Sequence, residues 1–387
     1  MRPSRRPTDP PKYWEADLKR ILLLTVGLAA CTQASAPDGV AATPDHGAKP
    51  AATAPAPKAT RDAPGTPHPG ALKTFGDWAV GCDNVRRCAM TSLGEDFGVD
   101  WPKVTMTVTR APGPRGGFDL AFDALADRSP APDAVSIDGR RLSLTGGLTG
   151  APAAAIVTAM ADAKRLAILS GQRTLSTVSL RGAAAALRYI DAEQGRAGTV
   201  TAVMAKGDAP ATNVPVAAPL PVVRMVRPVG RPAAIDTPTL DRLRKQAGCA
   251  MDVPADNPAG TMPPEAHALG GGRTLLIVPC SMGAYNLLAA LFVSQGRDWV
   301  PVRVDAPIGF AETGAEGDGP VPELVNGVWK DGVLTGYAKG RGLGDCGLVQ
   351  SLAWNGTRLR LTEQSEMREC RGNPNYLTTW RTRVVRD

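Results

Sequence analysis

The chain has 387 residues, which is enough for two domains with separate hydrophobic cores. Its formal net charge is +7, but the basic excess is not concentrated in any one segment, and aromatic residues make up only 5% of the composition. Proteins that bind nucleic acids gather basic residues on one surface, and those that bind single strands also need aromatic platforms for the bases. The composition therefore argues against a nucleic-acid partner.

The N-terminal residues predict export. Lys19 and Arg20 precede an apolar run over residues 21–28, and Cys31 follows two alanines. The run is typical of a secretory signal, because about 20 apolar residues would be needed to span a bilayer. The sequence Leu-Ala-Ala-Cys at residues 28–31 resembles a bacterial lipobox, in which the cysteine is diacylated and becomes the mature N-terminus.

We therefore expect residues 1–31 to be a lipoprotein signal and Cys31 to be lipidated, so that acyl chains anchor the protein to a membrane on the periplasmic side of the cell envelope. An ordinary signal peptide with a chance cysteine is the alternative. Thr32 is not the aspartate linked to inner-membrane retention in enteric bacteria, which favours the outer membrane.

Residues 32–71 consist mainly of alanine, proline and small polar residues without periodicity. Such a segment buries too little apolar surface to fold, so we expect a disordered tether between the lipid and the folded part. His46 and His68 lie within it and are not expected to be catalytic.

The remaining cysteines are even in number and form no C-x-x-C pair, which in an exported chain predicts disulfides and argues against a metal site. Six cysteines allow 15 pairings. Proximity in the sequence favours three of the possible bonds, Cys82–Cys88, Cys249–Cys280 and Cys346–Cys370.

Residues 72–207 predict a β-rich domain with two helices. Alternating apolar residues indicate strands with one buried face, and Asp138-Gly139 is typical of a tight hairpin turn. Strands are expected at residues 75–82, 88–90, 104–108, 166–169, 177–180 and 199–204, and helices at residues 152–162 and 183–193.

Residues 208–235 are rich in proline, alanine and valine and predict an extended linker of polyproline II type. The linker carries Arg224, Arg227 and Arg231. Those arginines indicate either a solvated linker, which we favour, or a contact with an anionic surface.

Residues 236–387 predict a second, disulfide-stapled β domain. Thr237 and Pro238 are typical of a helix start, and Gly248 would end that helix. Asp331-Gly332 and Asn355-Gly356, each preceded by a tryptophan, predict two hairpins of a meander. Strands are expected at residues 275–278, 287–293 and 299–302, and the two hairpins cover residues 328–334 and 353–359. The predicted fold class is thus α+β and mainly antiparallel β, with two disulfide-stapled domains joined by a proline-rich linker.

Several motifs carry a family resemblance, at residues 179–187, 191–196, 279–286, 343–347, 354–356, 367–372 and 380–382. Together they resemble a bacterial envelope family known as domain of unknown function 1176, over about residues 72–387. Leu348 and Val349 depart from the small polar residues usual in that family. Residues 72–207 also resemble the invasion-associated locus B proteins, a β-rich exported family, through Trp78-x3-Cys82 and residues 179–187. Neither resemblance implies a catalytic residue.

Residues able to perform catalysis are few. His267 lies in a segment rich in proline and glycine, residues 263–272, which predicts a surface loop, and Ser281 lacks a G-x-S-x-G context. The glycine run at residues 340–347 lacks the ending of a phosphate-binding loop. Glu366 and Glu369 could act as paired carboxylates, although ion pairs with neighbouring arginines are the favoured reading. No catalytic residue, cofactor or metal is predicted.

Asp345 and Arg371 flank Cys346 and Cys370, so we expect an ion pair or a turn cap there, with ligand contact as the less favoured role. The leading hypothesis is a non-enzymatic envelope lipoprotein that binds a protein or a peptidoglycan partner, in one version as an inhibitor of a secreted enzyme. The alternative is a hydrolase of envelope polymers that uses Glu366, Glu369 or Asp345. The candidate ligand contacts are Arg341, Asp345, Trp354, Glu366 and Arg371.

Overall fold

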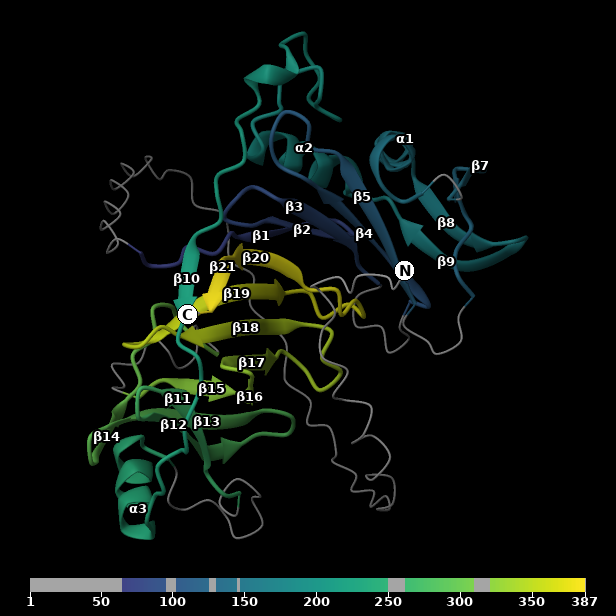
Figure 1. Cartoon of the computed structure of the whole chain (residues 1–387). Coiled ribbons are helices and arrows are strands. Elements are labelled where there is room, and N and C mark those ends of the chain that lie inside the picture. The colour runs from purple at the N-terminus through teal and green to yellow at the C-terminus, as the bar shows by residue number, and fades with distance from the viewer. Residues whose placement is uncertain are drawn as a thin grey trace, which may run out of the picture. The chain divides into compact units, whose positions relative to one another are not determined.

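The computed structural model describes residues 65–94, 102–124, 130–144, 147–249, 262–309 and 321–386. Antiparallel sheets with few helices make up these ranges, which confirms the predicted α+β, mainly β class (Figure 1). The predicted signal, Cys31 with its predicted lipidation, and most of the predicted tether lie outside the described residues. The division at residues 207 and 236 into two domains stays a prediction.

The first sheet is a five-stranded antiparallel meander in which each strand pairs with the next along the chain. Its strands are β1 (Leu72–Phe75), β2 (Trp78–Cys82), β3 (Cys88–Ser92), β4 (Val104–Arg110) and β5 (Phe118–Ala124). All five residues of β2 are buried, because both faces of this strand are covered.

A four-stranded sheet and two helices complete the N-terminal part. The strand order is β7-β6-β8-β9, and the β6–β7 turn has positive φ angles at Asp138 and Gly139, as expected for a tight hairpin. Apolar side chains of both sheets and both helices form one core. These elements are β6 (Ala134–Ile137), β7 (Arg140–Ser143), β8 (Arg165–Ser170), β9 (Arg173–Ser179), α1 (Gly150–Met160) and α2 (Ala183–Glu193).

The prediction of a strand at residues 199–204 is wrong. The segment instead folds around the buried carboxylate of Asp191, which accepts hydrogen bonds from the backbone N–H groups of Val203, Met204 and Ala205. Asp191 also forms a buried ion pair with Arg110 at 3.0 Å. A buried charge in need of donors thus overrides the local strand pattern.

The linker expected at residues 208–235 contains a short 3-10 helix (Ala211–Asn213) and a strand, β10 (Val222–Met225). This strand pairs in parallel with β21 (Arg383–Arg386) near the C-terminus. A strand whose partner lies so far along the chain leaves no local signal, so the sequence predicted only an extended segment.

The C-terminal part begins with α3 (Thr237–Gln246), which is capped by the side chain of Asp236 rather than by Thr237. Two five-stranded sheets follow. The first contains β11 (Glu265–Gly270), β12 (Arg273–Met282), β13 (Leu287–Gln295), β14 (Asp298–Pro301) and β15 (Glu323–Val325). The second contains β16 (Val328–Lys330), β17 (Val333–Lys339), β18 (Gly347–Trp354), β19 (Leu359–Met367) and β20 (Leu377–Arg381) in a meander.

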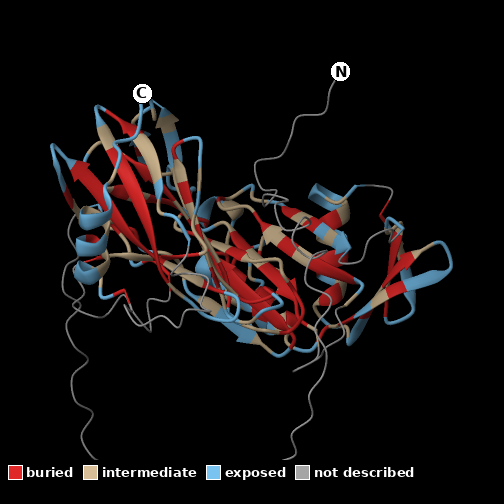
Figure 2. Cartoon of the chain, turned by 90° about the horizontal axis from the view of Figure 1, so that it is seen from below, coloured by how far each residue is buried: buried red, intermediate tan, exposed pale blue. Residues whose placement is uncertain are grey.

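Strand β12 is buried on both faces, because it lies between two cores. Leu275 and Ile277 pack against residues of the second sheet, whereas Leu276 and Val278 pack towards α3. Figure 2 shows buried residues running along the strands, with exposed residues mainly at turns and on helix surfaces. The segment around His267, which was expected to be a loop, is the strand β11.

Three disulfides join the cysteines that are nearest in the sequence. Cys82–Cys88 closes the turn between β2 and β3, and Cys249–Cys280 ties the end of α3 to β12. Cys346–Cys370 joins the loop before β18 to the segment after β19. Each bond thus fixes a connection between neighbouring elements.

Candidate functional site

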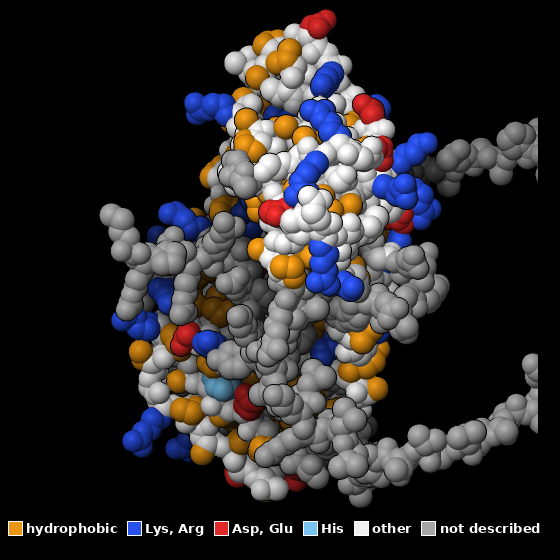
Figure 3. Space-filling model, turned by 90° about the vertical axis from the view of Figure 1, so that its right-hand side faces the viewer, with side chains coloured by type: hydrophobic (Ala, Val, Ile, Leu, Met, Phe, Trp, Pro, Cys, Tyr) orange, Lys and Arg blue, Asp and Glu red, His pale blue; other side chains and the backbone are white. Residues whose placement is uncertain are grey.

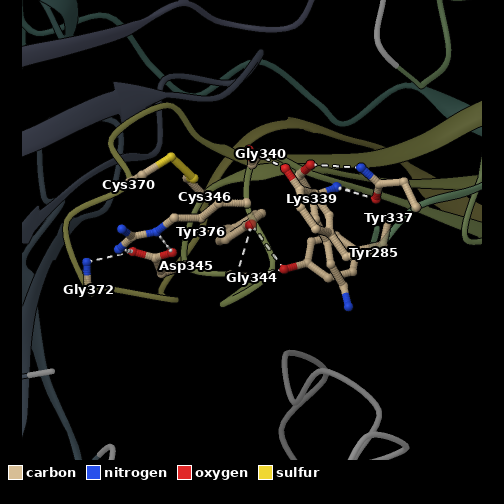
Figure 4. The surroundings of a disulfide bond; sticks show 12 residues. Tyr285, Tyr337, Lys339, Gly340, Gly344, Asp345, Cys346, Cys370, Gly372 and Tyr376 are labelled. Carbon is tan, nitrogen blue, oxygen red and sulfur yellow. Dashed lines mark hydrogen bonds and ion pairs between the residues drawn. A yellow bond between two sulfur atoms is a disulfide. The ribbon is translucent and has the colours of Figure 1, made fainter. Parts of the chain in front are cut away.

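The loop between β17 and β18 is shaped by its glycines (Figure 4). A Cβ at Gly347, where φ is +140°, would lie 2.1 Å from the carbonyl oxygen of Ala338, and a Cβ at Gly340 would lie 2.8 Å from Cys346 Sγ. Gly344 has a φ of +72°. The glycine run therefore lets the backbone pass close to the disulfide, rather than binding phosphate.

Asp345 belongs to this loop, and its side chain is fully buried. Its carboxylate accepts hydrogen bonds from Arg341 Nε at 2.7 Å and Nη2 at 2.5 Å, and from the Gly372 N–H at 2.6 Å. Burial alone would raise the pKa of Asp345, but these donors hold it below its ordinary value. The carboxylate thus stays ionised, and its ion pair is with Arg341 rather than with Arg371, the partner expected from the sequence, which binds Asp77 instead.

Two tyrosines form hydrogen bonds with the backbone in the middle of the loop. Tyr337 and Tyr376 donate to the carbonyl oxygen of Gly344 at 2.6 and 3.2 Å, and their hydroxyl oxygens are 3.1 Å apart. Burial raises the pKa of both phenols, so both remain protonated donors. Neither tyrosine could be singled out from the sequence, since the role of each depends on a contact with the loop.

A second turn, residues 282–287 between β12 and β13, is fastened to the loop. The Asn286 side chain donates to the Lys339 carbonyl at 2.9 Å and accepts from the Lys339 N–H at 3.1 Å. Asn326 donates to Asn286 Oδ1 at 2.8 Å. The Tyr285 hydroxyl donates to the carbonyl of Gly340 at 3.2 Å. The two turns therefore form one hydrogen-bonded unit.

Three large apolar side chains are exposed on this unit. Met282, Tyr285 and Leu343 are 37%, 38% and 48% exposed. A Cβ at Gly342, directly before Leu343, would lie 3.4 Å from the Tyr285 ring, which places the two turns in contact. We call Met282, Tyr285 and Leu343, with the partly exposed Arg341 beside them, the apolar surface.

Arg371 extends in the other direction, to the first sheet. Its guanidinium donates to Asp77 Oδ1 at 2.7 Å and to the carbonyls of Gly94 and Gly76 at 2.8 and 3.0 Å. Arg181 also donates to Asp77, at 2.7 Å. Hydrogen bonds from Arg181 and Arg371 outweigh burial and hold the pKa of Asp77 far below its ordinary value. Arg371 is thus a structural residue that binds distant backbone.

A small core supports this connection. It contains Ala79 and Leu93 of the first sheet region together with Cys346, Met367 and Leu377. Polar contacts flank it: Asp83 binds Arg381, and the buried Asn373 donates to Thr91 at 2.8 Å. We call this set of contacts the seam, because it joins the first sheet to the disulfide region.

The three carboxylates considered for hydrolysis are each bound to another protein group. Asp345 is held by Arg341, Glu366 lies 3.2 Å from Arg368 Nε, and Glu369 accepts from Thr74 Oγ1 at 2.7 Å. The Glu366–Arg368 contact matches the favoured reading of Glu366, whereas Asp345 is paired in a buried position and Glu369 binds a threonine hydroxyl.

Trp354, one of the candidate ligand contacts, lies in the hydrophobic core. It is only 2% exposed and packs in the core between the two C-terminal sheets, so it supports that core instead of contacting a ligand.

His267 stacks on Trp329 with ring centroids 5.6 Å apart and lies 3.0 Å from Glu265. Among the described residues, no group of three His, Cys, Asp or Glu side chains could hold a metal ion.

A family model described as "Protein of unknown function (DUF1176)" matches residues 72–385. The chain belongs to this family. It is also similar to the uncharacterized protein YpfG of Escherichia coli (strain K12), with 29% identity over 347 residues, which cover 81% of this chain and 93% of that protein.

No solved structure matches the chain. Within the described ranges, no helix has the length and apolar character needed to cross a membrane. The DUF1176 match covers both the seam and the apolar surface, so both belong to the part of the chain shared with the family.

Proposed function

We propose that this protein is an exported, lipid-anchored protein of the bacterial cell envelope that binds a protein partner through the apolar surface. The main support for this proposal is that Met282, Tyr285 and Leu343 are exposed on two turns that are joined by hydrogen bonds. Exposed apolar side chains that lie together on a folded surface are typical of interaction sites.

The chemistry of the apolar surface favours a protein partner. Tyrosine, methionine and arginine are enriched where proteins bind one another, and a tyrosine often provides much of the binding energy. The disulfide, the Asp345–Arg341 ion pair and the Asn286 bridge fix the backbone beneath these side chains. A surface that is already ordered loses little conformational entropy on binding.

Export is supported by the signal-like N-terminus and by three disulfides, which persist in oxidising compartments. We also propose that residues 72–207 are related to the exported invasion-associated locus B proteins through Trp78-x3-Cys82 and residues 179–187, a relationship that would agree with this compartment. Inhibition of a secreted enzyme is the sharper version of the proposal, by analogy with other small disulfide-clamped β domains. A peptidoglycan partner is the competing outcome.

Capture from an envelope extract tests the binding surface. The parent chain should retain a stoichiometric protein partner, and the Tyr285→Ser/Leu343→Ser variant should lose it. Val200→Ser/Val216→Ser is the matched control, because both valines are exposed and neither belongs to the apolar surface. Equal capture by the two double variants would contradict the proposal.

Two further measurements test the lipid anchoring and the competing hydrolase activity. Cys31→Ser should release the protein from membranes, and unchanged fractionation would refute lipid anchoring. Turnover of peptidoglycan fragments by the parent chain that is lost in Glu366→Gln would favour the hydrolase instead.

A further inference from the structure

Three segments distant in the sequence meet at one end of β18 and β19. Strand β10 pairs with β21, and the Arg383 N–H donates to the Pro221 carbonyl at 2.8 Å. The Val226 N–H donates to the Trp354 carbonyl at 2.9 Å, which fixes β10 beside the β18–β19 hairpin. In Figure 1, β10 and β21 lie at the end of β18 away from the disulfide loop.

This end of the molecule is rich in arginine. Residues 209–235 and 377–386 contain arginines but no aspartate or glutamate. Arg224, Arg227, Arg383 and Arg386 are exposed on or beside the β10–β21 pair, and we call them the arginine surface. By contrast, basic and acidic side chains are interspersed among the coloured residues in the view of Figure 3.

Acidic groups also lie near these arginines, and Asp387 directly follows Arg386 in the sequence. Asp305 is paired with Arg360, and Asp83 with Arg381, so both are engaged. Asp331 lies in the β16–β17 turn, and a Cβ at the adjacent Gly332 would lie 3.1 Å from Met225, so one acidic side chain borders the arginine surface.

The chain also reaches the folded part at this end. The carbonyl of Gly65, the first described residue, accepts from Arg360 Nη2 at 3.1 Å. Arg360 pairs with Ala353, one position from the β18–β19 hairpin turn. The described chain therefore begins close to the β18–β19 hairpin turn and the arginine surface, whereas Cys346 precedes the opposite end of β18.

We infer that the arginine surface docks on the anionic phospholipid headgroups of the membrane that carries the N-terminal lipid. This inference rests on the proposed anchoring for the identity of the membrane. Lipid chains and a basic patch act together in many peripheral proteins, because arginines near an anionic surface add to the affinity of the acyl chains. Docking in this way directs the apolar surface away from the bilayer, where a partner can reach it.

Vesicle binding tests the inference without the lipid. The full chain carrying Cys31→Ser is mixed with vesicles of phosphatidylglycerol and phosphatidylcholine, or of phosphatidylcholine alone, and the bound fraction is measured by sedimentation. The test variant adds Arg227→Gln, Arg383→Gln and Arg386→Gln. The matched control adds Arg140→Gln, Arg173→Gln and Arg188→Gln, which remove the same charge from exposed positions in the N-terminal part.

The parent should bind the anionic vesicles, more weakly as salt is raised, and the test variant should bind about 100-fold more weakly, at roughly fivefold per arginine. The control should remain within about twofold of the parent. Equal losses in both variants, equal parent binding to both vesicle types, or tight binding to a duplex oligonucleotide without vesicle binding would each overturn the inference. Fractionation of cells with and without Cys31→Ser tests lipidation separately, so the two proposals fail independently.

Discussion

Arg371 Nη2 lies 2.7 Å from Asp77 Oδ1, although 294 positions separate the two residues in the sequence. The pair joins the first sheet to the residue directly after the Cys346–Cys370 disulfide, and Arg181 binds the same carboxylate from the start of α2. The disulfide region is therefore supported from the first sheet as well as from its own strands. The Arg371–Asp77 pair thus holds the disulfide region of the candidate site against the first sheet.

Removing either charge of this pair should destabilise the protein strongly. Arg371→Gln or Asp77→Asn leaves partners of a mostly buried network uncompensated, at a cost of about 3–5 kcal/mol in the free energy of unfolding. A double-mutant cycle in urea should give a coupling energy of about 0.5–3 kcal/mol. The exposed Arg141–Asp133 pair is the control and should couple by less than about 1 kcal/mol. Similar coupling in both pairs would show that the seam contributes nothing special.

Stability should fall in acid for a defined reason. The folded-state pKa values of Asp77 and Asp345 lie below those of the unfolded chain, so their contribution is complete above the unfolded pKa of about 4. That contribution is lost as the pH falls from about 4 through the folded-state values. Urea unfolding from neutral to acidic pH should show this loss, and Asp77→Asn should have a shallower slope below about pH 4. A variant slope as steep as that of the parent would argue against the assignment.

Local patterns predicted much of the fold. The Asp138-Gly139 and Asp331-Gly332 turns lie where expected, with positive φ angles at both residues of each pair, because such turns are set by neighbouring residues alone. Asn355-Gly356 also lies in a hairpin turn, but that turn spans residues 355–358 and has a positive φ angle at Gly356 and not at Asn355. The expected helix at residues 183–193 has the predicted bounds. The cysteine pairs also followed from proximity along the chain.

Features that depend on distant partners were missed. Strand β10 needs β21, and the segment after Glu193 bends to satisfy Asp191, so neither could be predicted from its own residues. The ligand role expected for Trp354 was wrong, because its burial depends on how two sheets pack. Tyr285 lay in a motif of the family resemblance, which was the one available signal for the apolar surface.

Gly347 should be intolerant of any side chain. Gly347→Ala would place a Cβ 2.1 Å from the Ala338 carbonyl at a φ of +140°, and we expect a loss of at least about 1–3 kcal/mol in the free energy of unfolding. Gly117→Ala is the control, since nothing lies within 4 Å of its Cβ position and its φ is not positive. The midpoint of urea unfolding distinguishes them, and equal midpoints would contradict the close approach of the loop.

The Cys346–Cys370 bond should stabilise the native state. Replacing both cysteines by serine removes the closure of a loop with a sequence separation of 24, which costs about 3–4 kcal/mol in the chain-entropy model. Cys346 also packs in the seam core, so partner binding should weaken with stability. Unfolding and capture assays on the double variant test both effects. An unchanged midpoint would show that the other contacts hold the loop without the bond.

The central claim is that the apolar surface contacts a partner, and site-specific photo-crosslinking tests it most directly. A photoreactive residue in place of Leu343, which is 48% exposed, should give one cross-linked species of defined mass in the envelope. The same residue in place of the exposed Arg140 should give none. No cross-link from position 343, or the same products from both positions, would contradict the claim.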